Sequence, residues 1–167
     1  DALLAAGADL DLKLCGVHAM DCLRSEKGYR HWGHDITPAE TPLEAGLGFA
    51  VSFKKNSDFI GRTALERQIE KGIDRRLVHI MLEQPEPLLF HDETIYLDGG
   101  VAGIVTSGAF GYAFERPVGM GYLENFRAID ADALAARKFE IDIAGELVPA
   151  RLSLQPFYDP KGERLRS

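Results

Sequence analysis

The sequence has little cysteine, no long apolar run and no excess of positive charge. Its 167 residues include only Cys15 and Cys22, which excludes a disulfide-stapled scaffold and favours a reducing compartment. No apolar stretch approaches the roughly 20 residues that a membrane-spanning helix needs. The formal net charge is −7, whereas nonspecific nucleic-acid and anionic-membrane binding depend on clustered Lys and Arg. We therefore expect neither nucleic acid nor a membrane as a partner.

The composition is that of an ordinary globular chain. Hydrophobic residues make up 46% and charged residues 27%, and the length suits one domain or two small ones. The chain begins at Asp1 without a methionine and continues directly into ALLAAGADL, which reads as the middle of a helix. We expect it to be a piece of a longer polypeptide.

Residues 1–75 show mixed helical and strand patterns. The predicted helices are Ala2–Ala6, Val17–Lys27 and Thr63–Lys71, each followed by a glycine that can end a helix. The third helix has an amphipathic pattern, with Leu65 and Ile69 on its predicted inner face and Ala64 as a further candidate. Short strands are predicted at Leu10–Leu14 and Phe49–Phe53, with a loop over residues 31–42.

From residue 76 onward the hydrophobic period changes to two. Strands are predicted at Leu77–Leu82, Thr94–Leu97, Val101–Ser107, Val118–Leu123, Phe139–Ile143 and Leu147–Leu154, with a short helix at Ala131–Arg137. Hairpin turns are predicted at residues 98–100 and 144–146. Six short strands at this spacing favour a small closed antiparallel β-barrel. We therefore predict an α+β chain with one domain over residues 1–75 and a barrel domain over residues 76–167.

One carboxylate stands where a helix would place an apolar residue. Ala19, Cys22 and Leu23 precede Glu26 by seven, four and three positions, so these side chains share one helical face. A carboxylate on an inward face is costly to bury unless strong donors meet it.

Two kinds of donor fit Glu26. Arg24, Arg30 or a more distant cation could form an internal ion pair with it. Alternatively, a ligand with two parallel N–H donors, such as the aminopyrimidine edge of a pterin, could bind the carboxylate bidentately. The spacing alone does not choose between them.

Histidines and cysteines do not form a metal-binding pattern. His31 and His34 have an H-x-x-H spacing, and Cys15, His18 and Cys22 lie close in sequence. A structural zinc site usually needs four ligands in compact pairs, and no second pair is present. We predict no metal site.

Several separated motifs resemble the glycine-cleavage T-protein superfamily. They are AAGADLDL at 5–12, AMDCLRSEKGYRHWGHDITPAETPLEAGLGFAV at 19–51, DFIGRTAL at 58–65, GIVTSGAFGYAFERPVGMGYL at 103–123 and RLSLQPFYDPKGERLR at 151–166. The LRxEKGYRxWG pattern is most similar to the C-terminal region of FAD-dependent dimethylglycine and sarcosine dehydrogenases. The resemblance implies the end of a folate-binding domain followed by a six-stranded Greek-key or jelly-roll-like barrel.

The resemblance also implies a cofactor and a role for Glu26. The acidic residue of the LRxE motif contacts the pterin of tetrahydrofolate in this family, and Glu26 occupies that position. The family's catalytic aspartate belongs to an earlier part of the folate-binding domain, and the FAD-binding domain lies further upstream. We therefore expect no catalytic residue in this fragment, FAD only in the parent protein, and the upstream domains of the same polypeptide as partners.

Other residues near the motif are weaker candidates for folate contact. Tyr29, Arg30 and Trp32 could border or stack on a flat ligand. Lys54 and Lys55 could meet the carboxylates of a folate tail, although Ser57 stands where some relatives carry an arginine. Solvated surface lysines are the competing interpretation.

The resemblance implies that the whole enzyme captures a one-carbon unit from an oxidised N-methyl amine as 5,10-methylenetetrahydrofolate. A stand-alone aminomethyltransferase and a non-catalytic domain-docking module are the alternatives. The expected location is the cytoplasm, or the mitochondrial matrix in a eukaryote.

Overall fold

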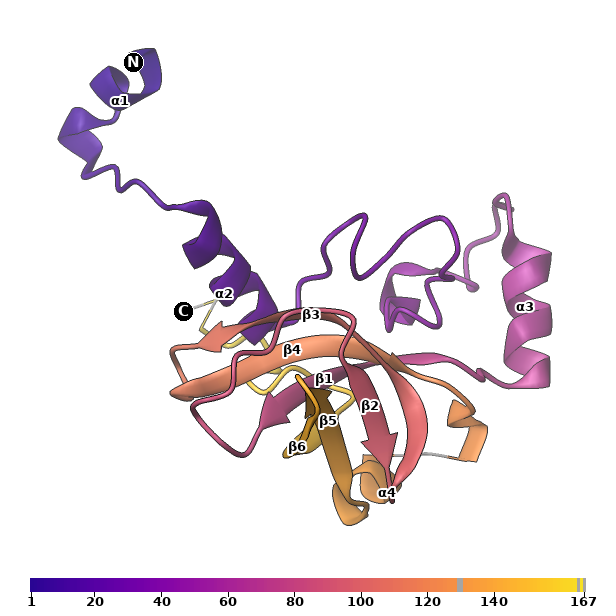
Figure 1. Ribbon diagram of the computed structural model, residues 1–167. Helices are drawn as coiled ribbons and strands as arrows, with labels where there is room; N and C mark the ends of the chain where they lie inside the picture. The colour runs from indigo at the N-terminus through magenta and orange to yellow at the C-terminus, as the bar shows by residue number, and fades with distance from the viewer. Residues whose placement is uncertain (129–130, 165, 167) are drawn as a thin grey trace.

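The computed structural model describes residues 1–128, 131–164 and 166 (Figure 1). Its helices are α1 (Ala2–Ala6), α2 (Val17–Lys27), α3 (Arg62–Lys71) and α4 (Ala131–Ala136), with short 3₁₀ helices η1 (Ala8–Leu10), η2 (Gly48–Ala50) and η3 (Phe126–Ala128). Its strands are β1 (Arg76–Leu82), β2 (Thr94–Leu97), β3 (Gly100–Gly111), β4 (Arg116–Leu123), β5 (Phe139–Ile143) and β6 (Glu146–Ser153).

The strands form a closed antiparallel barrel in the order β1-β4-β3-β2-β5-β6. Strands β2, β3 and β4 follow one another as a meander, and β1 lies beside β4, which is a Greek-key arrangement. Strands β5 and β6 close the barrel between β2 and β1. Closure leaves no free sheet edge among these strands.

Strand β1 is buried on both faces. Val78, Ile80 and Leu82 point into the barrel and belong to its main apolar core. Leu77 and His79 alternate with them and are also buried, because the N-terminal segment covers this side of the barrel. The outer face of β1 is therefore where the barrel meets the rest of the chain.

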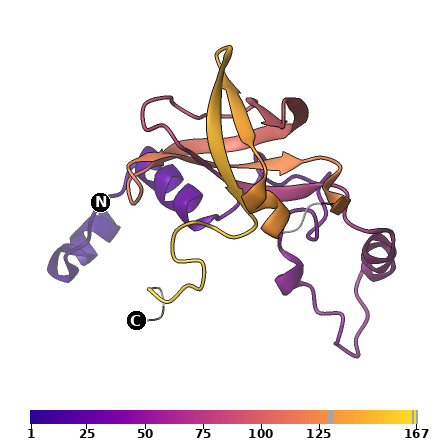
Figure 2. The ribbon, with the colours of Figure 1, turned by 90° about the horizontal axis from the view of Figure 1, so that it is seen from below.

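The middle part of the N-terminal segment, residues 1–75, packs against the barrel. The two ends of this segment extend away from the barrel on opposite sides (Figure 1). Helix α2 packs on β3 and β4, whereas α1 projects outward as an arm (Figure 1). Helix α3 lies on the opposite side of the molecule from α1, as the view from below also shows (Figure 2). None of the described helices has the length and apolar character that crossing a bilayer requires.

The barrel and most helices agree with the sequence predictions. The six predicted strands are all present, although β3 continues four residues beyond its predicted end at Ser107. Helix α2 has the predicted bounds, since Gly28 ends it in the left-handed region at φ 71°. The predicted division of the chain at residues 75 and 76 stays a prediction, and β1 begins at Arg76.

Two predicted strands are wrong. The residues of Leu10–Leu14 form the end of η1 and an exposed connection, and those of Phe49–Phe53 form part of η2 and a loop. Neither segment lies beside another strand, so their alternating apolar residues have no sheet to join.

The predicted inner faces of two helices are also partly wrong. On α2, Glu26 is buried as predicted, but Ala19 is exposed and Leu23 is 60% exposed. On α3, Leu65 is buried whereas Ile69 is exposed. In both helices the apolar stripe is wider than the surface that the described residues offer for packing.

A glycine on β3 provides a test of barrel packing. A Cβ at Gly103 would lie 1.9 Å from the backbone oxygen of Tyr122 on β4, so the two paired strands would have to separate. We expect Gly103→Ala to lower the free energy of unfolding by about 2 kcal/mol or more, measured by urea denaturation. Gly100→Ala on the same strand meets only the Leu97 oxygen at 3.7 Å and should change stability by about 0.5 kcal/mol or less. Equal effects of the two variants would contradict this account of the strand contact.

Candidate functional site

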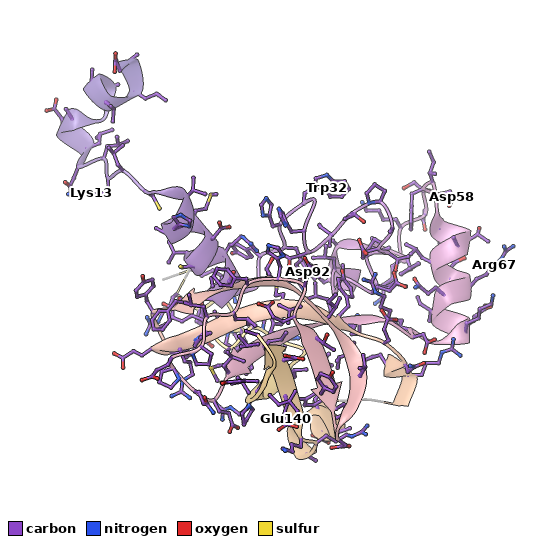
Figure 3. All side chains as sticks on the ribbon, in the orientation of Figure 1. Lys13, Trp32, Asp58, Arg67, Asp92 and Glu140 are labelled. Carbon is purple, nitrogen blue, oxygen red and sulfur yellow. The ribbon has the colours of Figure 1, made fainter. Side chains whose placement is uncertain are left out.

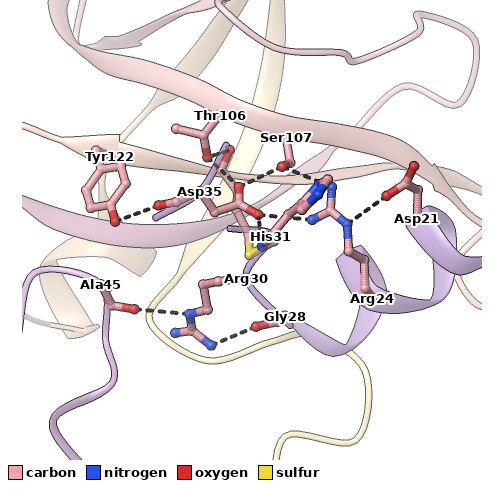
Figure 4. Close-up of polar contacts among 11 residues, drawn as sticks. Asp21, Arg24, Gly28, Arg30, His31, Asp35, Ala45, Thr106, Ser107 and Tyr122 are labelled. Atoms are coloured by element: carbon pink, nitrogen blue, oxygen red, sulfur yellow. Dashed lines mark hydrogen bonds and ion pairs between the residues drawn. The ribbon is translucent and has the colours of Figure 1, made fainter. Parts of the chain in front are cut away.

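A buried carboxylate, Asp35, joins the N-terminal segment to the barrel (Figure 4). Its exposed fraction is 0%. Arg24 on α2 donates from Nη1 to Asp35 Oδ2 at 3.0 Å, and the backbone N–H of His31 donates to the same oxygen at 2.8 Å. The hydroxyls of Thr106 and Ser107 on β3 both donate to Oδ1 at 2.6 Å. Asp35 thus holds α2, the following loop and β3 in one hydrogen-bonded cluster.

A bulge in β3 makes this arrangement possible. Consecutive residues of a regular strand point to opposite faces, so two adjacent hydroxyls would not reach one carboxylate oxygen. The pairing with β4 shifts between Val105 and Ser107, which leaves Thr106 as the extra residue. The bulge therefore turns both hydroxyls toward Asp35. Tyr122 on β4 adds a hydrogen bond from its hydroxyl to the Asp35 backbone oxygen at 2.8 Å.

Glu26 lies at the C-terminal end of α2 and is 7% exposed. Its Oε1 accepts a hydrogen bond from the backbone N–H of Ala113, in the turn between β3 and β4, at 2.9 Å. Arg24 pairs with Asp21 and Asp35 instead, and within the described residues no cation forms an ion pair with Glu26. The internal ion pair between Glu26 and a cation, one of the two possibilities that the sequence left open, is therefore absent among the described residues.

The second oxygen of Glu26 remains available for another donor. Oε2 has no hydrogen-bond partner among the described residues, and Glu26 lines a cavity of about 430 Å³. The other lining residues are mostly apolar or aromatic: Cys15, Met20, Leu23, Arg24, Lys27, Tyr29, Ala113 and Tyr158. A largely apolar cavity with one convergent carboxylate is a typical small-molecule site.

Of the two aromatic residues predicted to contact the ligand, one lines the Glu26 cavity and the other does not. Tyr29 lines the Glu26 cavity. Trp32 is 65% exposed and projects from the loop away from the barrel (Figure 3). Trp32 is absent from the lining of the Glu26 cavity, and its predicted ligand contact stays a prediction.

Arg30 lies at a different cavity of about 710 Å³. Its Nε donates to the Ala45 oxygen at 3.0 Å and its Nη1 to the Gly28 oxygen at 2.7 Å (Figure 4). Arg76 and the buried His79 line the same cavity. Burial lowers the pKa of His79 to about 3, with a further contribution from the neighbouring Arg30 charge, so the imidazole is neutral at physiological pH.

Lys54 and Lys55 are both exposed. Lys55 lines another cavity, of about 540 Å³, beside the start of α3, together with Ser57 and Asp58. Neither lysine lines the Glu26 cavity, and their predicted contact with a folate tail stays a prediction.

Three residues of the site carried no usable signal in the sequence. Ala113 contributes only a backbone N–H, which any residue except proline could supply. Tyr158 reaches the cavity from the C-terminal segment after β6. Asp35 lies within the predicted loop over residues 31–42, where its neighbours in the sequence do not distinguish it from the other polar residues. Among the described residues, no group of three or more His, Cys, Asp or Glu side chains is arranged to hold a metal ion.

Comparison with known proteins connects this arrangement to a family. The profile described as "Glycine cleavage T-protein C-terminal barrel domain" matches residues 75–159, and the profile described as "GCVT N-terminal domain" matches residues 1–55. The chain belongs to the glycine cleavage T-protein family. The family resemblance of the sequence motifs is thereby confirmed.

Relatives within the T-protein family include amine-oxidising enzymes. The chain is 48% identical over 166 residues to 4-methylaminobutanoate oxidase (formaldehyde-forming) of Paenarthrobacter nicotinovorans. This match covers 99% of this chain and 19% of that protein. It is 36% identical over 167 residues to human mitochondrial sarcosine dehydrogenase, covering 99% of this chain and 18% of that protein. The chain therefore spans about a fifth of the length of these curated relatives.

A solved structure supports the T-protein fold. The crystal structure of the glycine cleavage system aminomethyltransferase T from Bartonella henselae superposes with a TM-score of 0.80 and 27% sequence identity. The match covers 95% of this chain and 44% of that chain. The predicted α+β fold with a terminal antiparallel barrel is confirmed.

The Asp35 cluster predicts a large loss of stability in one variant and a small loss in another. In Asp35→Asn the partly buried Arg24 guanidinium loses its fully buried counterion, so we expect the free energy of unfolding to fall by about 3–5 kcal/mol. Asp21→Asn removes the second carboxylate partner of Arg24. Because the Asp21 side chain is 33% exposed, this variant should lose about 1 kcal/mol or less of the free energy of unfolding. Urea denaturation of both variants measures the difference, and similar losses would contradict the central role of Asp35.

His79 predicts a pH dependence of stability. Its pKa is about 3 in the folded chain against an ordinary value of 6.5, so the unfolded state binds more protons between these values. We expect the contribution of His79 to stability to be complete above pH 6.5. It should be lost as the pH falls toward 3, by up to about 1.4 kcal/mol per pH unit.

Denaturation curves across this pH range test the assignment. His79→Gln should have a shallower dependence of stability on pH than the parent chain, because the titrating group is absent. His18→Gln replaces an exposed histidine and should keep the parent slope. An unchanged slope in His79→Gln would show that His79 does not carry the effect.

Proposed function

We propose that this chain supplies one wall of a tetrahydrofolate site, with Glu26 as the residue that holds the pterin. The observation that carries the proposal is the half-satisfied state of the Glu26 carboxylate. Ala113 orients Oε1, whereas Oε2 has no partner among the described residues and Glu26 lines the cavity.

The chemistry of the cavity suits a pterin. The aminopyrimidine edge carries adjacent N–H donors, and a carboxylate is the side chain that accepts such donors most strongly. Met20 and Leu23 provide apolar surface, and Tyr29 and Tyr158 provide aromatic surface, for a flat ring. The Ala113 hydrogen bond restricts rotation of Glu26, so less conformational entropy is lost when a ligand binds.

The apolar surface beside the cavity supports a further part of the proposal. Exposed apolar side chains lie just before α2 and on it, at Leu14, Val17, Met20 and Leu23. Contiguous exposed apolar surface of this kind marks an interaction site. We propose that upstream domains of the same polypeptide cover this surface and complete the folate site. The relatives are long enough to contain such domains, since this chain spans about a fifth of their length.

The proposed contribution of this chain to the reaction is positional. Bound tetrahydrofolate supplies the nucleophilic nitrogen that accepts a one-carbon unit. Glu26 would hold the pterin so that this nitrogen faces the carbon donor, and fixed orientation of this kind lowers the entropic part of a barrier. The proton-transfer residue and the FAD that oxidises an N-methyl amine would belong to the rest of the parent protein, so the fragment alone would be inactive.

The dehydrogenase branch is the preferred parent. The chain is 48% identical to the amine-oxidising 4-methylaminobutanoate oxidase, against 39% for an aminomethyltransferase of Symbiobacterium thermophilum. A stand-alone aminomethyltransferase is the alternative parent within the family. We propose the cytoplasm as the location, or the mitochondrial matrix in a eukaryote. The name of the human relative describes that protein as mitochondrial.

Folate binding to Glu26 variants tests the proposal. In the complete polypeptide that carries this chain, we expect Glu26→Gln to weaken tetrahydrofolate binding by about tenfold or more, because a charged acceptor of two hydrogen bonds becomes a neutral amide. Isothermal titration calorimetry with a reduced folate measures the dissociation constant.

Glu70→Gln is the matched control, since Glu70 is an exposed glutamate on α3 outside the Glu26 cavity. It should bind folate as the parent protein does. Equal affinity in Glu26→Gln and the parent would show that Glu26 does not hold the pterin. Absence of folate binding in the complete parent protein would favour a domain-docking role for this chain.

A further inference from the structure

The cavity beside Arg30 contains a concentration of positive charge that the proposed folate site does not use. Among the described residues, its lining contains the cations Lys27, Arg30, Arg76, Lys161 and Arg166 and no Asp or Glu. The nearby carboxylate of Asp159 pairs with Lys27 at 2.8 Å, and Asp35 pairs with Arg24. The two partly buried guanidiniums, Arg30 and Arg76, therefore have no carboxylate of their own in the described part of the chain.

These two guanidiniums converge over a glycine. A Cβ at Gly46 would lie 2.8 Å from Arg30 Nη2 and 3.8 Å from Arg76 Nη2, and Gly46 has a positive φ of 72°. The other donors of Arg30 bind the oxygens of Ala45 and Gly28, and Arg76 Nη1 donates to the Leu43 oxygen. Each arginine is thus anchored by backbone oxygens, and its Nη2, near the space above Gly46, has no hydrogen-bond partner among the residues that the structure describes.

The buried histidine in the same lining also lacks a partner. His79 is 2% exposed, and within the described residues neither of its ring nitrogens has a hydrogen-bond partner. A neutral imidazole always carries one N–H that requires an acceptor when it is buried. Gly28 leaves room for the ring, because a Cβ there would lie 2.4 Å from His79 Cε1.

We propose that Arg30, Arg76 and His79 form a binding site for a small oxyanion, a carboxylate or phosphate group, in a cavity next to the Glu26 cavity, with which it shares only Lys27 and Tyr29 of its lining. Two guanidiniums held close together repel each other unless an anion lies between them. Planar guanidinium groups donate paired hydrogen bonds to carboxylate and phosphate oxygens. Lys161, which is exposed at the cavity, adds positive charge at its entrance.

The direct test is calorimetric titration of the complete polypeptide with inorganic phosphate and, separately, with succinate, in a low-salt buffer without competing anions. We expect saturable binding of at least one anion, weakened about tenfold or more in Arg76→Gln. Arg76→Lys keeps the charge but loses the planar fork and should show an intermediate loss. The two titrations distinguish phosphate from carboxylate as the preferred chemistry.

Arg67→Gln is the matched control, because Arg67 projects into solvent from α3 (Figure 3). It should bind the anion as the parent does. Glu26→Gln should also leave anion binding unchanged, which separates this site from the proposed folate site. Absence of saturable binding by both anions, or equal binding in the parent and Arg76→Gln, would overturn the proposal.

A measurement on the unmodified protein avoids dependence on the folding of Arg76→Gln. Phenylglyoxal modifies accessible guanidiniums, and modified peptides can be quantified by mass spectrometry. We expect the preferred anion to slow modification of Arg30 and Arg76 severalfold while Arg67 reacts at its usual rate. Unchanged modification of Arg30 and Arg76 at saturating anion would likewise overturn the proposal.

Discussion

The hydrogen-bonded carboxylate of Asp35 is the interaction on which the arrangement of this protein depends. It is completely buried, so each of its oxygens must be satisfied by protein donors. Arg24, the His31 backbone and the β3 bulge provide those donors. Because these groups come from a helix, a loop and a barrel strand, satisfying one carboxylate fixes the position of all three elements.

Both proposed sites lie beside the helix end that Asp35 holds in place. Glu26 is within one turn of Arg24 on α2, and its orienting donor, Ala113, belongs to the turn at the end of β3. On the other side, the chain after Gly28 brings Arg30 against His79 on the outer face of β1. Lys27 and Tyr29 line both cavities. Movement of α2 relative to the barrel would therefore disturb both sites together.

Much of the fold could be predicted because its signals are local. Alternating apolar residues predict the strands, and glycines at left-handed positions such as Gly28 and Gly99 end a helix or form a hairpin. The predictions failed where an apolar stripe had no surface to pack against, as at Leu23 and Ile69. Periodicity predicts which residues share a face, but it does not reveal whether another part of the protein covers that face.

The sequence by itself determined the helix and strand segments, the family and the unusual position of Glu26, since these depend on neighbouring residues and recognisable motifs. Only the tertiary structure decided what each polar group contacts. The donor to Glu26 is a backbone N–H 87 positions away, and the hydroxyl donors to Asp35 lie 71 and 72 positions away. A backbone N–H leaves no mark on residue identity, and a strand bulge depends on register between strands, so neither could be read from the chain before it folds.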